Sequence, residues 1–277
     1  MELELFLKFL NEYYLTHDDE VKNIIESYIE SESMSINLEA FKEMFPAILV
    51  SLYNFIKTSS NVPEIIKKKV EEKEDDYTLL NEELVYIWTH AAIPLTLSWE
   101  KAPKDFTRRI LVPLRSNLSD IMYAALSTMR SQLSEMVYLE GGEYSFVSQA
   151  EYNEDDEKTY LASDYAAYAI YELGNPKMCY GYLDAWVFDI TLNHIRILDD
   201  KKAKMPLLLV DAKGFGIFEG NQENVINSID NPMYQTRDSV KAKDMLGVDF
   251  TETSIDDMKE TLVENFYLTQ YRYEAAE

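Results

Sequence analysis

The sequence predicts an α+β protein, in which a helical N-terminal region is followed by a small mixed α/β core. Through residues 1–150, apolar side chains recur with the spacing of one helix face. Residues 151–277 instead contain short runs of β-branched and aromatic residues between polar turns. An acidic stretch over residues 143–158 separates the two patterns. We therefore expect two domains, a helical one over residues 1–150 and an α/β one over residues 151–277.

The composition indicates a folded chain with a strongly acidic surface. The chain has 277 residues, of which 47% are hydrophobic, enough for one large domain or two small ones with their own cores. The net charge is −24, with 25 acids against 14 bases in residues 1–150 and 25 against 12 in residues 151–277. Such a surface repels nucleic-acid phosphates at long range. A nucleic-acid partner would therefore need a local group of bases.

Cysteine content and hydropathy limit the class of protein. The single cysteine, Cys179, excludes an internal disulfide and a metal site of four cysteines. The longest apolar run, residues 45–56, is interrupted by Pro46, Ser51 and Asn54 and is too short to span a bilayer. The first residues carry no basic leader. We expect a cytoplasmic protein with no membrane partner.

Within residues 1–150 the pattern predicts a series of helices in chain order. They are helices over residues 3–14 and 21–29, a long helix capped by Ser35 and kinked or restarted at Pro46, a helix started by Pro63, a helix over residues 79–89 and a helical pair over residues 104–139. The charge run between the fourth and fifth of these is typical of a solvated helix end. The apolar N-terminal helices suit an interface between copies of the chain, so we expect a homo-oligomer.

Residues 151–277 are expected to alternate helices and strands. In order, the elements are a helix over residues 165–173, a strand over 180–190, a short strand over 194–198, a strand that starts at Pro206, a helix over 230–246 and a final helix over 255–271. Helical spacing places Glu172 on the face that carries two tyrosines of the first helix. The strand from Pro206 ends in Asp211-Ala-Lys213. Because strand side chains alternate, Leu209, Asp211 and Lys213 should share one face.

The order of these elements and two motifs resemble the PD-(D/E)xK nuclease superfamily, most closely its RecB-type branch as found in phage proteins. Gly181-Tyr-Leu-Asp184 and Asp211-Ala-Lys213-Gly214 match the motifs of that branch, with the two acids 27 residues apart. Asn231-Pro-Met-Tyr-Gln235 resembles the Asn-Pro-Gln of its next helix, with the glutamine displaced by two positions. The resemblance covers residues 164–245 and does not extend to the first 150 residues.

The resemblance implies a metal-dependent DNA nuclease of phage or mobile-element type. Its metal would be Mg²⁺ or Mn²⁺, which prefer oxygen ligands. The implied metal ligands are Asp184, Asp211 and, for a second ion or a water, Glu172. The implied catalytic residues are Lys213, Glu172 and Gln235, with Tyr234 in support and the Ala212 carbonyl beside the metal.

Several alternatives remain open on the sequence alone. Asp211 and Lys213 would also form an ordinary ion pair at a strand end, and Asp189 is the second choice for the upstream metal ligand. The arginines of residues 108–130 would either contact DNA or pair with neighbouring acids. If the nuclease-like core is not catalytic, the protein would be an acidic inhibitor, DNA mimic or anti-defence binding protein, or an oligomeric assembly protein. Its partner is therefore expected to be DNA or a basic DNA-binding protein.

Overall fold

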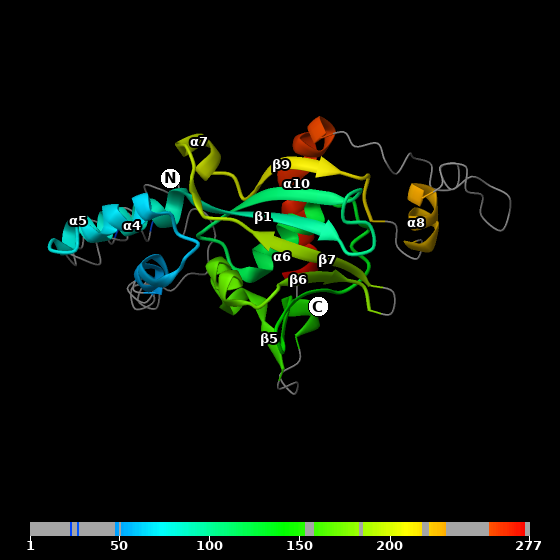
Figure 1. Cartoon of the computed structure of the whole chain (residues 1–277), viewed down its shortest axis with the longest axis horizontal. Helices are drawn as coiled ribbons and strands as arrows, with labels where there is room; N and C mark the ends of the chain where they lie inside the picture. The colour runs from blue at the N-terminus through cyan, green and yellow to red at the C-terminus, as the bar shows by residue number, and fades with distance from the viewer. Residues whose placement is uncertain are drawn as a thin grey trace. The chain divides into compact units, whose positions relative to one another are not determined.

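The computed structural model describes residues 23, 27, 48–49, 51–152, 158–182, 185–217, 222–230 and 255–274. Its described elements combine helices with one mixed sheet, which confirms the α+β class (Figure 1). The chain divides into unit 1, formed by Met1–Ala91 and Ile197–Lys204, and unit 2, formed by Ala92–Arg196 and Met205–Glu277. The boundary expected after residue 150 lies inside unit 2, within the 3₁₀ helix η1 (Gln149–Glu151).

The described part of unit 1 is mainly helical. Its elements are a helix over residues 51–58, α4 (Glu64–Glu71), α5 (Tyr77–His90) and α7 (Asp200–Ala203). Pro63 precedes α4 as predicted. The Asp76 carboxylate caps α5 by accepting hydrogen bonds from the backbone N–H groups of Thr78 and Leu79, at 3.0 and 3.2 Å. This cap starts α5 two residues before the helix predicted over 79–89.

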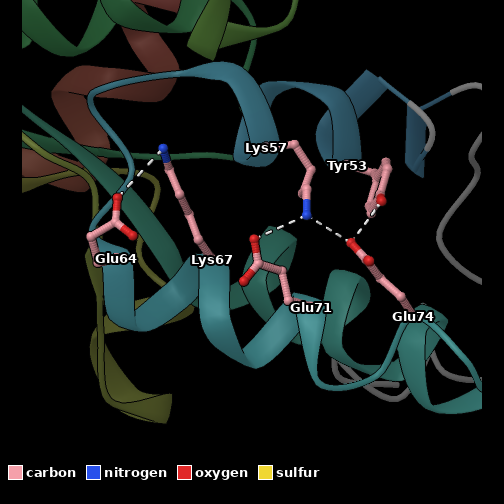
Figure 2. A network of polar contacts seen from close by, with 6 residues as sticks. All are labelled: Tyr53, Lys57, Glu64, Lys67, Glu71 and Glu74. Atoms are coloured by element: carbon pink, nitrogen blue, oxygen red, sulfur yellow. Dashed lines mark hydrogen bonds and ion pairs between the residues drawn. The ribbon is translucent and has the colours of Figure 1, made fainter.

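A network of ion pairs joins the helix over residues 51–58 to α4 and to the turn that follows it (Figure 2). Lys57 Nζ lies 3.0 Å from Glu71 Oε1 and 2.9 Å from Glu74 Oε1, and the Tyr53 hydroxyl donates to Glu74 at 2.8 Å. These hydrogen bonds, chiefly the one between Lys57 and Glu74, raise the pKa of Lys57 and lower that of Glu74. The charged groups remain in contact with solvent, so each ion pair should contribute little to stability.

The described residues form a nine-stranded sheet that lies mostly in unit 2. Its strands are β1 (Ala91–Trp99), β2 (Thr107–Pro113), β3 (Val137–Gly141), β4 (Tyr144–Val147), β5 (Thr159–Leu161), β6 (Lys177–Tyr180), β7 (Trp186–Leu192), β8 (Arg196–Ile197) and β9 (Leu208–Lys213). Their order is β5-β4-β3-β6-β7-β1-β2-β9, with β8 beside β1. Along this order neighbouring strands are antiparallel, except for the parallel pair β4 and β5. β9 is therefore an edge strand.

The helical pair predicted over residues 104–139 is wrong for most of its length. The structure places β2, a helix α6 (Leu118–Ser127) and the start of β3 in this range. In β2 the buried residues are Arg108, Ile110, Val112 and the terminal Pro113, and the first three alternate with more exposed ones. This period of two indicates a strand, but an arginine at one of the inward positions hides it from a hydrophobicity pattern.

One face of the sheet is covered by α6 and by α10 (Ile255–Glu274), which lie behind the strands in the view of Figure 1. α6 packs against β2, β3 and α10, and its residues are buried except for half-buried Asp120. Its N-terminus has a capping box, in which Asn117 and Asp120 exchange hydrogen bonds of 3.0 and 2.8 Å. The final helix predicted over 255–271 is confirmed by α10. A further helix, α8, spans Gln222–Asp230.

The helix predicted over residues 165–173 is two short 3₁₀ helices, η2 (Ala162–Asp164) and η3 (Ala167–Glu172). The backbone groups at the junction of η2 and η3 instead bond to residues around the start of α6. The N–H of Leu118 donates to the Tyr165 carbonyl at 3.0 Å, and the N–H of Ala167 donates to the Ser116 carbonyl at 2.8 Å. These non-local bonds take the backbone groups that a continuous helix would use.

The strand predicted over residues 180–190 is two antiparallel strands, β6 and β7, which turn near Gly181. Gly181 has a φ of 97°, a conformation that side chains with a Cβ rarely adopt. Trp186 of β7 stacks on Trp99 of the neighbouring strand β1, with ring centroids 4.3 Å apart. Phe106 and Phe188 lie beside the pair, so the hairpin ends in a buried aromatic core.

Candidate functional site

The Asp211-Ala-Lys213 motif lies at the end of edge strand β9, as the sequence predicts. Its residues do not follow a regular alternation, because the pairing with β2 shifts by one residue at Val210. Leu209 and Ala212 are buried, whereas Val210 and Lys213 are exposed and Asp211 is half-buried. The expectation that Leu209 shares the face of Asp211 is therefore wrong, and the bulge is the reason. Asp211 and Lys213 themselves lie on the same, open side of the strand.

Both charged groups of the motif have hydrogen bonds to nearby backbone. The Asp211 carboxylate accepts a bond of 3.0 Å from the N–H of Ala212, and Lys213 Nζ donates to the Lys104 carbonyl oxygen at 3.4 Å. Asp211 lies opposite Arg109 of β2 in the strand register. Opposite charges facing each other across two strands stabilise the pairing, and charged residues with a bulge also protect an edge strand from further pairing. The motif thus has a structural account beside the catalytic one.

The chain just beyond β9 is held by Arg108, whose side chain is 0% exposed. Its guanidinium donates to the carbonyl oxygens of Thr128 at 2.7 Å, Thr107 at 2.8 Å, Gly214 at 2.9 Å and Phe215 at 3.1 Å, and also to that of Lys213. Burial, with a smaller effect of Arg130, lowers the pKa of Arg108. All five donors of the guanidinium are used. Arg108 therefore fixes the backbone on which Lys213 sits.

The glycines of the motif are required by this packing. Gly214 has a φ of +74°, and a Cβ there would lie 2.8 Å from the Asp105 carbonyl oxygen. A Cβ at Gly216 would lie 2.6 Å from the Met129 carbonyl oxygen. Both contacts are with backbone, which cannot move aside as a flexible side chain can. The match of these glycines to a nuclease motif consequently has an explanation that needs no substrate.

Four exposed bases belong to segments that meet at the C-terminal end of β9, and we call this group the β9 basic patch: Lys104, Arg109, Arg130 and Lys213. Arg109 and Lys104 contact the motif as described above, and the Arg130 guanidinium lies 4.4 Å from the centre of the Phe215 ring. Residues 101–150 hold six bases against five acids, whereas residues 1–100 hold eight bases against twenty acids. The patch is thus a local concentration of positive charge in an acidic chain.

Glu172 is not brought to Asp211. It is exposed at the end of η3, where the neighbouring Tyr171 hydroxyl bonds to the Asn193 carbonyl beyond β7 at 2.6 Å. β7 is separated from β9 by β1 and β2, so three strand spacings of about 4.8 Å put roughly 14 Å between them. Carboxylates that share one Mg²⁺ lie within a few ångströms of each other, since each oxygen is about 2.1 Å from the ion.

The other sequence-predicted residues lie apart from the motif or outside the described residues. Asp184, Tyr234 and Gln235 belong to the residues that the structure does not describe. Asp189 is exposed on β7, three strands from β9, and lies 3.5 Å from Lys177 Nζ. In the described part of the chain, no three His, Cys, Asp or Glu side chains come together in a group that could hold a metal ion. No helix within that part has the length and apolarity to cross a bilayer.

A second surface feature, which the sequence analysis did not single out, lies at the β4 and β5 end of the sheet. Tyr144, Phe146, Tyr160 and Tyr165 form a cluster with ring centroids 5.2 to 6.1 Å apart, and we call it the aromatic cluster. Tyr144 and Tyr165 are 52% and 36% exposed. The alternation of Tyr144 and Phe146 along one strand was the available signal, but the contribution of Tyr165 depends on tertiary structure.

Comparisons with known proteins bear on the fold only. No family model matches the chain, and no curated protein matches it. A solved structure, the protein of unknown function MM3350 from Methanosarcina mazei Go1, superimposes with a TM-score of 0.50 and 14% sequence identity. The match covers 61% of this chain and 97% of that one. At this identity the likeness shows that the two proteins share a fold.

Proposed function

We propose that this chain is a metal-dependent DNA nuclease that hydrolyses phosphodiester bonds at the β9 basic patch. The main support is that four exposed bases belong to segments that meet at the end of β9, the strand that carries the half-buried Asp211, in a chain of net charge −24. Arginine and lysine bind backbone phosphates, so the patch would place a DNA strand beside Asp211 despite the acidic remainder. The Asp-x-Lys motif at that position adds a metal-binding acid and a cation on one side of one strand.

The residues present fit Mg²⁺ or Mn²⁺ in part. Within the described residues, the Asp211 carboxylate accepts the Ala212 N–H at one oxygen, and its other lone pairs remain for a cation. Mg²⁺ in proteins is often held by only one or two carboxylates together with substrate phosphate. Asp211 and the Ala212 carbonyl would hold the ion here, with Asp184 as the further ligand that the motif implies. When bound, the ion would polarise the scissile phosphate.

Lys213 has the position to act on the same phosphate. Its ammonium uses one donor on the Lys104 carbonyl and keeps two for phosphate oxygens. Arg109, opposite Asp211, can hold a neighbouring phosphate by a two-donor contact. These two cations would offset the negative charge that develops as the phosphodiester is attacked.

The test is metal binding by calorimetry and cleavage of end-labelled DNA with Asp211→Asn, which keeps the size of the side chain. We expect loss of Mg²⁺ or Mn²⁺ binding and loss of cleavage. Asp189→Asn, the same change on β7, tests the second choice for the upstream ligand, and Glu140→Gln on β3 is the control on an exposed acid elsewhere in the sheet. Cleavage that persists in Asp211→Asn would contradict the proposal.

DNA affinity is measured on the same samples, against Arg109→Gln. Loss of one phosphate contact should reduce the slope of log affinity against log salt by about 0.9. Wild type that binds DNA without cutting it would retain the patch as a binding site and exclude catalysis. Wild type that does neither would exclude both.

A second candidate function, an acidic protein that binds a basic partner, is favoured by the exposed face of α10. Asp256, Glu260 and Glu264 recur every four residues and are all exposed. A helix rises 1.5 Å per residue, so these carboxylates are spaced by about 6 Å along one face. Such a row can pair with the cations of a DNA-binding surface. The test is calorimetric titration with a hepta-arginine peptide, whose binding should weaken when all three acids are changed to their amides.

A further inference from the structure

The aromatic cluster combines accessible rings with nearby negative charge. Tyr160 is nearly perpendicular to Tyr144 and to Tyr165, at 77° and 90°, and Phe146 is edge-on to Tyr165 at 82°. Edge-to-face packing of this kind fixes the rings without help from a ligand. Phe146 is 5% exposed and anchors the group, while Tyr144 and Tyr165 keep much of their surface in solvent.

The charge around the cluster is acidic. Asp164 directly precedes Tyr165, and with Tyr152 and Tyr160 it adds to the effect of burial in raising the pKa of the Tyr165 hydroxyl. Glu143 is exposed beside Tyr144, and Glu151 precedes Tyr152. The neighbouring base is Lys158, whose carbonyl accepts a hydrogen bond from the Ser145 N–H at 3.1 Å. Of these four described residues, three are acids and one is a base.

Rings with electron-rich faces beside carboxylates attract organic cations. A guanidinium or ammonium group within about 6 Å of a ring centroid is drawn to the ring, and arginine is the more frequent partner. A nucleotide base would also stack on tyrosine, but its phosphates would meet Asp164, Glu143 and Glu151. The local charge therefore favours a cation over a nucleic acid.

We propose that the aromatic cluster is a binding site for arginine side chains of a basic protein segment, with Tyr144 and Tyr165 as the contacting rings and Asp164 as the charge partner. This proposal rests on the second candidate function and assigns the part of the surface at which the basic partner would bind. It lies at the opposite end of the sheet order from β9. The aromatic cluster would bind a cation, whereas the β9 basic patch would bind an anion.

The experiment is a calorimetric titration of the whole chain with an acetylated hepta-arginine peptide. Tyr144→Leu and Tyr165→Leu, which remove the ring but keep apolar bulk, should each weaken binding by about two- to fivefold. Tyr144→Phe and Tyr165→Phe keep the ring and should bind as wild type does. Tyr182→Leu is the matched control, because Tyr182 is 76% exposed just after β6 and lies outside both the cluster and α10.

Folding and ligand class are read from the same variants. Thermal unfolding identifies a leucine variant that has lost structure, and normal affinity of the phenylalanine variants shows that the ring is what matters. If the leucine variants weaken binding of a single-stranded oligonucleotide and leave the peptide unaffected, the cluster stacks bases and the cation assignment is overturned.

The same titrations distinguish failure of the second candidate function from failure of the cluster as its binding site. Peptide binding that is unchanged in the leucine variants but lost when the α10 acids are changed to amides would keep the function and overturn the cluster as its site. Absence of peptide binding to wild type would overturn both. Asp164→Asn should weaken binding of the peptide and reduce the salt dependence of that binding. Unchanged affinity at low salt would contradict the role given to that acid.

Discussion

Lys57 in unit 1 and Arg108 in unit 2 show two opposite ways to hold a cation. Lys57 lies at the surface between the carboxylates of Glu71 and Glu74, in contact with solvent, and the Tyr53 hydroxyl also donates to Glu74. Arg108 is fully buried and contacts no carboxylate of the described residues, and its charge is stabilised by five backbone carbonyl oxygens and by the Phe106 ring 4.4 Å away. The number of ionic partners is therefore a poor guide to importance. Burial, and what is left unbonded when the cation is removed, decides the cost.

The largest effect is expected for Arg108→Met, which keeps the length of the side chain and removes all of its donors. The carbonyl oxygens of Lys213, Gly214 and Phe215 would lose a donor in the interior. We expect the free energy of unfolding of unit 2 to fall by about 3–5 kcal/mol. Urea denaturation followed by tryptophan fluorescence measures it. Arg108→Lys, with three donors, should lie between this variant and wild type, and wild-type stability of Arg108→Met would contradict the contrast drawn above.

A smaller loss is expected for Gly214→Ala, which tests the backbone that Arg108 holds. A Cβ there combines a positive φ with a 2.8 Å contact to a carbonyl oxygen, and about 2–3 kcal/mol should be lost. Gly142 is the matched control, because its φ is +64° but no atom lies within 4 Å of the added Cβ. Gly142→Ala should therefore cost about 1 kcal/mol. Equal losses at the two sites would show that the close contact relaxes freely.

Groups of intermediate burial should show their effect through pH. Burial raises the pKa of Asp120 on α6, against the opposing effects of the Asn117 N–H and Arg115, and burial together with Asp120 raises that of Glu274 on α10. Because the folded pKa lies above the unfolded one, the stabilisation is complete below the unfolded pKa and is lost as pH rises through the folded value. Stability should therefore increase when the pH is lowered from neutrality.

Glu274→Gln measures the share of this pH dependence that belongs to α10. The variant should be as stable as acidified wild type and should respond less to pH between 7 and 5. Thermal unfolding at a series of pH values follows the effect. A variant with the same pH dependence as wild type would assign the effect to other carboxyl groups.

The smallest effect is expected for Lys57→Met in the surface network of Figure 2. Exposed ion pairs are screened by solvent and need ordered side chains, so the midpoint of thermal unfolding should not move measurably. A clear loss of stability that high salt does not reproduce would show that the network packs the helices together. That result would overturn the rule drawn from the comparison with Arg108.

Much of the C-terminal fold could be predicted from short apolar runs. The strand that ends at Lys213 and the helix that starts at Ile255 were found because their patterns are local. The strand β2 was missed because Arg108 occupies an inward position, where its five carbonyl partners come from residues as far as 107 positions away along the chain. No local pattern contains that information. The break between η2 and η3 was missed for the same reason, since bonds to residues 116 and 118 cause it.

The candidate site could be predicted in part. The shared side of Asp211 and Lys213 follows from their spacing, and the bulge at Val210 does not, because it arises from the pairing with β2. Helical spacing gave Glu172 an inward face, but a 3₁₀ helix with three residues per turn directs it elsewhere. The basic patch draws its members from three separate segments of the chain, residues 104–109, Arg130 and Lys213. Only the tertiary structure brings them together.

The division of the chain at Ala91, Arg196 and Lys204 means that the covalent path passes between the units three times. α7 lies on the segment that returns to unit 1, where the Leu198 N–H donates to the His90 carbonyl at 2.7 Å. A fragment that begins at Ala92 would keep α7 but lose α5, the helix it packs against. One proteolytic cut after Ala91 would likewise leave residues 197–204 attached to the C-terminal piece. Separating the units cleanly would require excising both stretches and joining Arg196 to Met205 with a short linker.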